Sequence, residues 1–360
     1  MRPFEWQQAA SAALAAAQAT HTTAQAMLDA SGVPAEAQGI LIKAGGVDVL
    51  DLLKAELIHP RRLLDIGGLA ELRGITHAGD GRTRIGALTT LAQLASHAEV
   101  ASAYPALAQA AGQAASPQVR NRATLGGNLL QRPRCWYLRS AAHHCTRKGG
   151  AHCFAYTGDH RYHAVFANHG CAIVHPSTPA TALLAYGASI ELLDGKGRRR
   201  EVALEDFFLL PQADMHRENL LERGEILTTV WLPAGTPGSR SIYLQVGERA
   251  AFDWPLAAVA AVLDLGPDGL CRDARLVLGA AAPIPWRARA AEALLAGRKL
   301  DATVVAAAGE AALEGASPLP GNAYKLKLLG ALVRRALVAL VGAGEAAGLT
   351  RPAASQGQNW

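Results

Sequence analysis

Two glycine-containing turns restrict the fold of this 360-residue sequence more than any other feature. The first, Lys43 to Asp48, reads KAGGVD and follows the short apolar run Ile40–Ile42, and the second, Ala123 to Asn128, reads ATLGGN. Paired glycines after a strand let backbone N–H groups converge on a ligand such as a pyrophosphate without an intervening Cβ. Neither turn matches G-x-G-x-x-G or G-x-x-x-x-G-K-[ST], which excludes the standard dinucleotide and P-loop motifs. Either turn alone is also compatible with a purely structural role, as the similar DIGG at residues 65–68 illustrates.

Composition predicts a globular protein of two or three domains. Half of the residues are hydrophobic and 18% are charged, which is enough to build a sizeable core. The net charge of +5 comes without a long Lys/Arg run, so we expect no nucleic-acid partner. We find no signal peptide and no stretch of eighteen apolar residues, and therefore expect no membrane insertion and a cytoplasmic location. Co-export with a signal-bearing partner would place the chain in the periplasm instead.

The pattern of short strands and helices predicts a small α/β subdomain in the N-terminal third. The alanine-rich first 38 residues are expected to be helical, Leu63–Ile66 and Thr83–Ala87 are expected to be strands, and either Thr89 or Thr90 is a candidate N-cap. From Ser241 the order changes to strands followed by two helices, which predicts an antiparallel sheet with helices on one face. We expect an N-terminal subdomain at 1–115, a second subdomain at 116–236, a C-terminal α+β domain at 237–350 and a tail at 351–360.

Taken together, AGG-x-D and ATLGGN resemble the FAD-binding subunit of the molybdenum hydroxylases. The segments RIGALTTLAQL, ERGEILTTVWLP and GERAAFDWPLAAVAAVL extend this resemblance over nearly the whole chain. It implies an α+β fold with a two-part FAD-binding region of the vanillyl-alcohol-oxidase/CO-dehydrogenase-flavoprotein type and a C-terminal domain. It also implies an oxidoreductase subunit in a heterotrimer with a molybdopterin-binding large subunit and a [2Fe-2S] small subunit. Electrons would pass through FAD to an external acceptor after an aldehyde or N-heterocycle is oxidised in the large subunit, so no catalytic residue is assigned here.

The resemblance implies a set of FAD-binding residues at the two turns and near the flavin ring. Three positions depart from the family pattern, because Val47 replaces the usual threonine, Ser177-Thr178 replaces a pair ending in aspartate, and Gln245 replaces a lysine of some members. The implied contacts are Lys43, Ala44, Gly45, Gly46, Val47, Asp48, Val49, Ala123, Thr124, Gly126, Gly127, Asn128, Ser177, Leu227 and Gln245.

Four of the five cysteines lie in or beside one insertion, residues 131–174, which we call the cysteine segment. Cys135, Cys145, Cys153 and Cys171 are separated by spacings of C-x9-C, C-x7-C and C-x17-C. Disulfides fit a cytoplasmic chain poorly, and four thiolates suit either a closed zinc site or an iron–sulfur cluster, so spacing leaves zinc and iron open. The fifth cysteine, Cys271, is expected to be a small residue at the start of a strand.

The position of the cysteine segment, directly after ATLGGN, resembles the flavin subunits of 4-hydroxybenzoyl-CoA reductases and aldehyde oxidoreductases, and the pattern N-L-L-Q-R-x-R-C-x-Y at Asn128 to Tyr137 is most similar to the aldehyde oxidoreductase branch. That resemblance implies a [4Fe-4S] cluster with Cys135, Cys145, Cys153 and Cys171 as ligands. The basic side chains of Arg132, Arg134, Arg147 and Lys148 would then offset the negative charge of the cluster. Two alternatives stay open at this point: a stand-alone flavin oxidoreductase, and a non-redox binding module stabilised by zinc.

Overall fold

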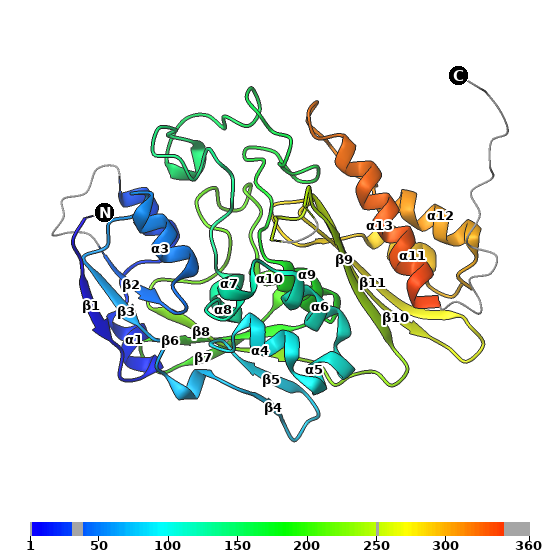
Figure 1. Cartoon of the computed structure of the whole chain (residues 1–360), viewed down its shortest axis with the longest axis horizontal. Helices are drawn as coiled ribbons and strands as arrows, with labels where there is room; N and C mark the ends of the chain where they lie inside the picture. The colour runs from blue at the N-terminus through cyan, green and yellow to red at the C-terminus, as the bar shows by residue number, and fades with distance from the viewer. Residues whose placement is uncertain (1, 31–38, 250–251, 342–360) are drawn as a thin grey trace.

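The computed structural model describes residues 2–30, 39–249 and 252–341, so the expected tail at 351–360 lies outside the described residues. The described chain is a mixture of helices and three sheets (Figure 1). The N-terminal sheet, a central sheet and the C-terminal sheet follow one another across the molecule, and the cysteine segment rises above the central part. No helix in the described ranges is both long and apolar enough to cross a membrane.

The N-terminal sheet is parallel, with strand order β1-β3-β2. Its elements are β1 (Glu5–Gln8), α1 (Ala12–Gln18), α2 (Thr23–Asp29), β2 (Ile40–Lys43), α3 (Val47–Lys54) and β3 (Arg62–Asp65). Helix α3 makes the crossover that two neighbouring parallel strands require. The expectation that the first 38 residues are helical was wrong for Glu5–Gln8, because these residues pair with β3, and residues 31–38 lie outside the described ranges.

The central sheet is antiparallel, with strand order β4-β5-β8-β6-β7. Its strands are β4 (Ile75–His77), β5 (Thr83–Gly86), β6 (Ser189–Asp194), β7 (Arg199–Ala203) and β8 (Glu225–Leu232). The accompanying helices are α4 (Leu91–Ser96), α5 (Ala98–Ala103), α6 (Pro105–Gln113), α9 (Thr178–Ala185) and α10 (Leu204–Phe207). The predicted cap at Thr90 is confirmed, since its hydroxyl accepts a hydrogen bond from the Gln93 N–H and the Gln93 side chain accepts one from the Thr90 N–H.

The C-terminal sheet is antiparallel and carries helices on one face, as expected. It contains β9 (Arg240–Val246), β10 (Ala257–Leu265), β11 (Cys271–Gly279) and β12 (Trp286–Arg287), followed by α11 (Arg289–Leu295), α12 (Ala302–Ala311) and α13 (Tyr324–Val341). Helix α12 adds a third helix to the predicted two, and the Asp301 side chain caps it. Cys271 opens β11 and is fully buried, so its predicted place at the start of a strand is confirmed.

Strand β10 is apolar from Ala257 to Leu263, and both of its faces are packed against other parts of the chain. Ala258 and Ala260 belong to the core that includes α6 and α9, whereas Val259, Ala261 and Leu263 belong to the core beneath α13. Side chains alternate between the two faces of a strand, so one uninterrupted apolar run supplies both cores. The C-terminal domain is therefore packed onto the rest of the chain through its own sheet.

The short helix α7 (Pro117–Arg120) is followed by α8 (Leu125–Leu129). The cysteine segment occupies most of the chain between α8 and α9. Within it the structure has one short 3₁₀ turn, Thr146–Lys148, and otherwise irregular backbone. Its end is fixed to the C-terminal domain by the Lys325 ammonium, which donates to the carbonyls of His163 at 3.0 Å and Ala280 at 2.6 Å. A long ordered segment without regular structure in a compact protein is usually functional.

Lys325 should make stability depend on pH. Burial lowers its pKa to about 7 from an ordinary value of 10.5, so the unfolded chain holds this proton to a higher pH than the folded chain. Between pH 7 and 10 the unfolded state therefore binds more protons, and the free energy of unfolding should rise with pH. We expect Lys325→Met to flatten this rise in denaturant titrations. Lys327→Met, at an exposed position of α13, is the control, and an unchanged slope in Lys325→Met would contradict the prediction.

Candidate cofactor site

The two glycine turns meet although they belong to different parts of the fold. A Cβ placed on Gly45 would lie 2.0 Å from the carbonyl oxygen of Arg122, immediately before the second turn. A Cβ on Gly126 would lie 2.9 Å from the Cβ of Ala87. Only glycine permits the first contact, because a side chain at Gly45 would push the two turns apart, whereas one at Gly126 would push the second turn away from Ala87.

The first turn leads directly into helix α3. Gly46 adopts a left-handed conformation with φ of 85° and is the N-cap of α3, so the helix begins at Val47. The first N–H groups of a helix have no acceptor within it, and together with the helix dipole they favour an anion. The Lys43 ammonium is occupied elsewhere, because it pairs with the Asp65 carboxylate at 3.1 Å and lies 4.7 Å from the centre of the Trp6 ring.

The second turn is fixed by hydrogen bonds from its own backbone and side chains. Thr124 caps α8 by accepting from the Gly127 N–H, while the Gly126 N–H donates to the Ala87 carbonyl at 2.9 Å. The Ser177 hydroxyl, which also caps α9, donates to the Asn128 side-chain oxygen at 2.6 Å. These hydrogen bonds hold the turn in place, and the Ser177 hydroxyl fixes the orientation of the Asn128 side chain.

The two turns line one cavity of about 400 Å³, which we call the glycine-loop cavity. Its size falls within the usual range for small-molecule sites. Every predicted FAD contact lines it except two. Ser177 is buried behind Asn128, and Gln245 lines a neighbouring cavity and accepts a hydrogen bond from the Tyr243 hydroxyl. Leu227, from β8, lines the glycine-loop cavity.

Several cavity residues were not predicted from the sequence. Arg134 comes from the cysteine segment and Trp254 from the C-terminal domain, and the Arg134 guanidinium lies 4.9 Å from the centre of the Trp254 ring. Glu218, Asn219 and Glu222 line the cavity from the loop before β8. These residues carry no local motif, because their segments reach the cavity only through long-range packing.

Asp48 lines the cavity, but its carboxylate is engaged by the cysteine segment. It accepts from Arg139 at 2.6 Å, from Arg134 at 3.0 Å and from the Arg132 backbone N–H at 2.9 Å. An unpaired carboxylate at the start of α3 would repel a pyrophosphate held there. The two guanidinium groups offset that charge, so the cysteine segment makes the first turn suitable for an anionic cofactor.

The lining of the glycine-loop cavity fits FAD. The glycines leave room for a close approach of a pyrophosphate to backbone, and the α3 N-terminus supplies unpaired N–H groups. Apolar side chains such as Leu41, Ile66 and Leu227 line other parts of the cavity and suit aromatic rings.

The four clustered cysteines approach one another but are not arranged as a finished metal site. All five cysteines are free thiols, and among the described residues no group of three or more His, Cys, Asp or Glu side chains could hold a metal ion. A hydrogen bond between Cys153 and Cys171 lowers the pKa of Cys171 and raises that of Cys153. Burial raises the pKa of Cys135 to about 12, and its sulfur lies 3.3 Å from Nε2 of His163. The predicted cluster is therefore not shown by the geometry.

Gly45 provides a direct test of the cavity. We expect Gly45→Ala to weaken FAD binding by roughly tenfold or more, about 1.4 kcal/mol, because the new Cβ would separate the two turns. Gly68→Ala is the matched control, since no heavy atom of the described chain lies within 4 Å of a Cβ there. Titration of the apoprotein with FAD measures both variants, and equal affinities would contradict the assignment of the turns.

Comparison with known families matches the chain in two consecutive parts. Residues 9–235 match the FAD binding domain in molybdopterin dehydrogenase, and residues 242–340 match the CO dehydrogenase flavoprotein C-terminal domain. These matches confirm the predicted fold class.

Individual relatives agree with the family match. The aldehyde oxidoreductase FAD-binding subunit PaoB of Escherichia coli is 39% identical over 277 residues, covering 76% of this chain and 84% of that protein. The carbon monoxide dehydrogenase medium chain of Hydrogenophaga pseudoflava is 30% identical and covers 82% of this chain and 86% of its own. A solved structure of carbon monoxide dehydrogenase from the same organism superposes with a TM-score of 0.68, covering 94% of this chain and 98% of that one. The chain therefore belongs to the FAD-binding subunits of the molybdenum hydroxylase family.

Proposed function

We propose that this chain is the electron-transfer subunit of a molybdenum-dependent hydroxylase complex. Electrons taken from the substrate at a partner's molybdenum centre would pass through a [2Fe-2S] subunit to FAD in this chain, and then to an external acceptor. The observation that carries the proposal is the convergence of both glycine turns on one cavity next to the N-terminus of α3. The names of the relatives, a medium chain and an FAD-binding subunit, support a role within a larger complex.

We propose an aldehyde as the substrate of the complex. The 39% identity to an aldehyde oxidoreductase subunit exceeds the 30% identity to xanthine dehydrogenase FAD-binding subunits and the 29% identity to the nicotine 6-hydroxylase medium subunit. The substrate itself would be bound and oxidised by the molybdopterin-binding subunit. The role of this chain is then to bind FAD, orient it and set its potential.

The residues of this chain would perform that role through fixed backbone and fixed charges. The N–H groups at the start of α3 would hold the pyrophosphate, Gly45 would keep the two turns close enough for it, and Gly126 would let the second turn pack against Ala87. Arg134 and Arg139 would keep the Asp48 carboxylate from repelling the phosphates. Bound FAD would supply the chemistry of accepting and releasing electrons.

We further propose that the cysteine segment holds a [4Fe-4S] cluster through Cys135, Cys145, Cys153 and Cys171. Similarity to the aldehyde oxidoreductase subunit and the presence of all four thiols in one segment support the proposal. The buried cations Arg132, Arg147 and Lys148 exceed the buried Glu218 anion, which suits a negatively charged thiolate centre. A zinc ion with four thiolates would carry the same net charge as an oxidised cluster, so electrostatics does not choose between the metals.

Metal analysis of a cysteine variant tests the cluster. We expect the purified protein to be yellow-brown and to contain one FAD and about four irons, the content of one [4Fe-4S] cluster. Cys135→Ser should lose most of its iron and the accompanying broad visible absorbance while retaining FAD. Cys271→Ser is the control, because Cys271 is buried in β11 and should not affect iron content. Unchanged iron in Cys135→Ser would overturn this ligand assignment, and zinc in place of iron in the wild type would overturn the cluster.

A further inference from the structure

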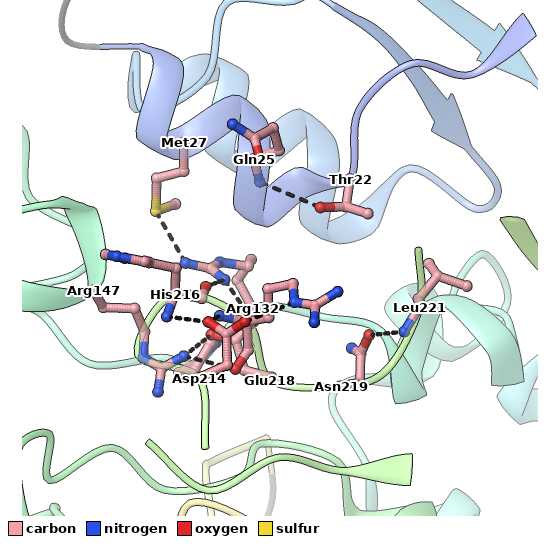
Figure 2. Close-up of polar contacts among 12 residues, drawn as sticks. Thr22, Gln25, Met27, Arg132, Arg147, Asp214, His216, Glu218, Asn219 and Leu221 are labelled. Carbon is pink, nitrogen blue, oxygen red and sulfur yellow. Dashed lines mark hydrogen bonds and ion pairs between the residues drawn. The ribbon is translucent and has the colours of Figure 1, made fainter. Parts of the chain in front are cut away.

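Glu218 lies between the glycine-loop cavity and the cysteine segment. It lines the cavity, yet only 7% of its side chain is exposed to solvent. One carboxylate oxygen accepts from the Arg132 guanidinium at 2.5 Å, and the other accepts from the Arg147 guanidinium at 2.8 Å (Figure 2). Both arginines belong to the cysteine segment and are 1% exposed, so this ion cluster is buried.

The two arginines also bind the backbone of the loop that carries Glu218. Arg132 donates to the His216 carbonyl at 2.8 Å, and Arg147 donates to the Arg217 carbonyl at 3.3 Å. The loop is fixed on its other side, since the Leu209 N–H donates to the Glu218 carbonyl and the Leu220 N–H donates to the Phe207 carbonyl. The position of this cavity wall therefore depends on the cysteine segment.

Arg132 also binds the opposite wall of the cavity, at the start of α3. Its backbone N–H donates to the Asp48 carboxylate at the start of α3, while its side chain reaches Glu218. One residue of the cysteine segment thus joins the helix behind the first glycine turn to the loop before β8. Both walls of the cavity are therefore held by the same segment.

The charges of this ion cluster make the link between the cysteine segment and the loop before β8 sensitive to the loss of a charged side chain. Two buried guanidinium groups share a single carboxylate, and Nε and NH2 of Arg147 are buried without a hydrogen-bond partner in the described chain. Removing the carboxylate would leave two cations buried and unpaired, and the cysteine segment would have to move to hydrate them.

We propose that Glu218 is a positioning residue that couples FAD binding to the ordering of the cysteine segment. FAD that binds between walls fixed by Arg132 and Glu218 stabilises the segment, and an ordered segment strengthens FAD binding by the same factor. The proposal rests on the proposed function, because it requires FAD to be the ligand of the glycine-loop cavity.

Hydrogen–deuterium exchange of the full-length chain, with and without FAD, tests the coupling. In the wild type, FAD should slow exchange in peptides covering residues 131–174. Glu218→Gln should abolish most of this FAD-dependent protection and weaken FAD binding by roughly tenfold or more, the range expected of an allosteric coupling. Glu201→Gln is the matched control, because Glu201 carries the same charge but pairs with Arg82 at the surface and does not line the cavity.

A second variant keeps the test decisive if Glu218→Gln does not fold. Arg147→Met leaves the Arg132–Glu218 pair intact, one cation to one anion, and should lose FAD-dependent protection around residues 145–153 while keeping it around residues 131–139. Wild-type protection and affinity in both Glu218→Gln and Arg147→Met would overturn the coupling and leave the proposed function standing. Failure of the wild-type chain to bind FAD would overturn both.

Discussion

The site depends on one close approach of backbone to backbone. Gly45, after a strand of the parallel N-terminal sheet, touches the carbonyl of Arg122, just before the turn that opens α8 beside the central antiparallel sheet. Neither sheet encloses the glycine-loop cavity alone, and a single Cβ at Gly45 would keep their turns apart. The turn at α3 brings unpaired N–H groups to that meeting point, so a steric requirement and an electrostatic one are satisfied at the same place.

The cysteine segment illustrates how irregular chain becomes ordered. Because it has almost no regular secondary structure, its polar groups need partners from elsewhere, and three parts of the fold supply them. Asp48 holds it to the N-terminal sheet, Glu218 holds it to the cavity wall, and Lys325 holds it to the C-terminal domain. The segment therefore packs against several elements around the cofactor site, and substitutions in it should change the shape of the cavity.

Much of the fold could be predicted from local patterns. The apolar run of β10, the cap at Thr90 and the two glycine turns each leave a signal within a few residues, and the structure places them as expected for these elements. The strand at Glu5–Gln8 was missed because only its pairing with β3 makes it a strand. Glu218 and its arginines lie 86 and 71 positions apart in the chain, so no periodicity or motif could have joined them. Likewise, Arg134 and Trp254 meet only after the C-terminal domain has packed.

The central claim is that this chain transfers electrons and leaves substrate oxidation to a partner. The most direct measurement is anaerobic mixing with an aldehyde, following the visible absorbance of the bound flavin, for the isolated chain and for the chain with its partner subunits. We expect the flavin to be reduced only when the partner subunits are present, and the isolated chain to keep its oxidised spectrum. Reduction of the flavin in the isolated chain by the aldehyde would contradict the account and indicate a self-sufficient flavin oxidoreductase.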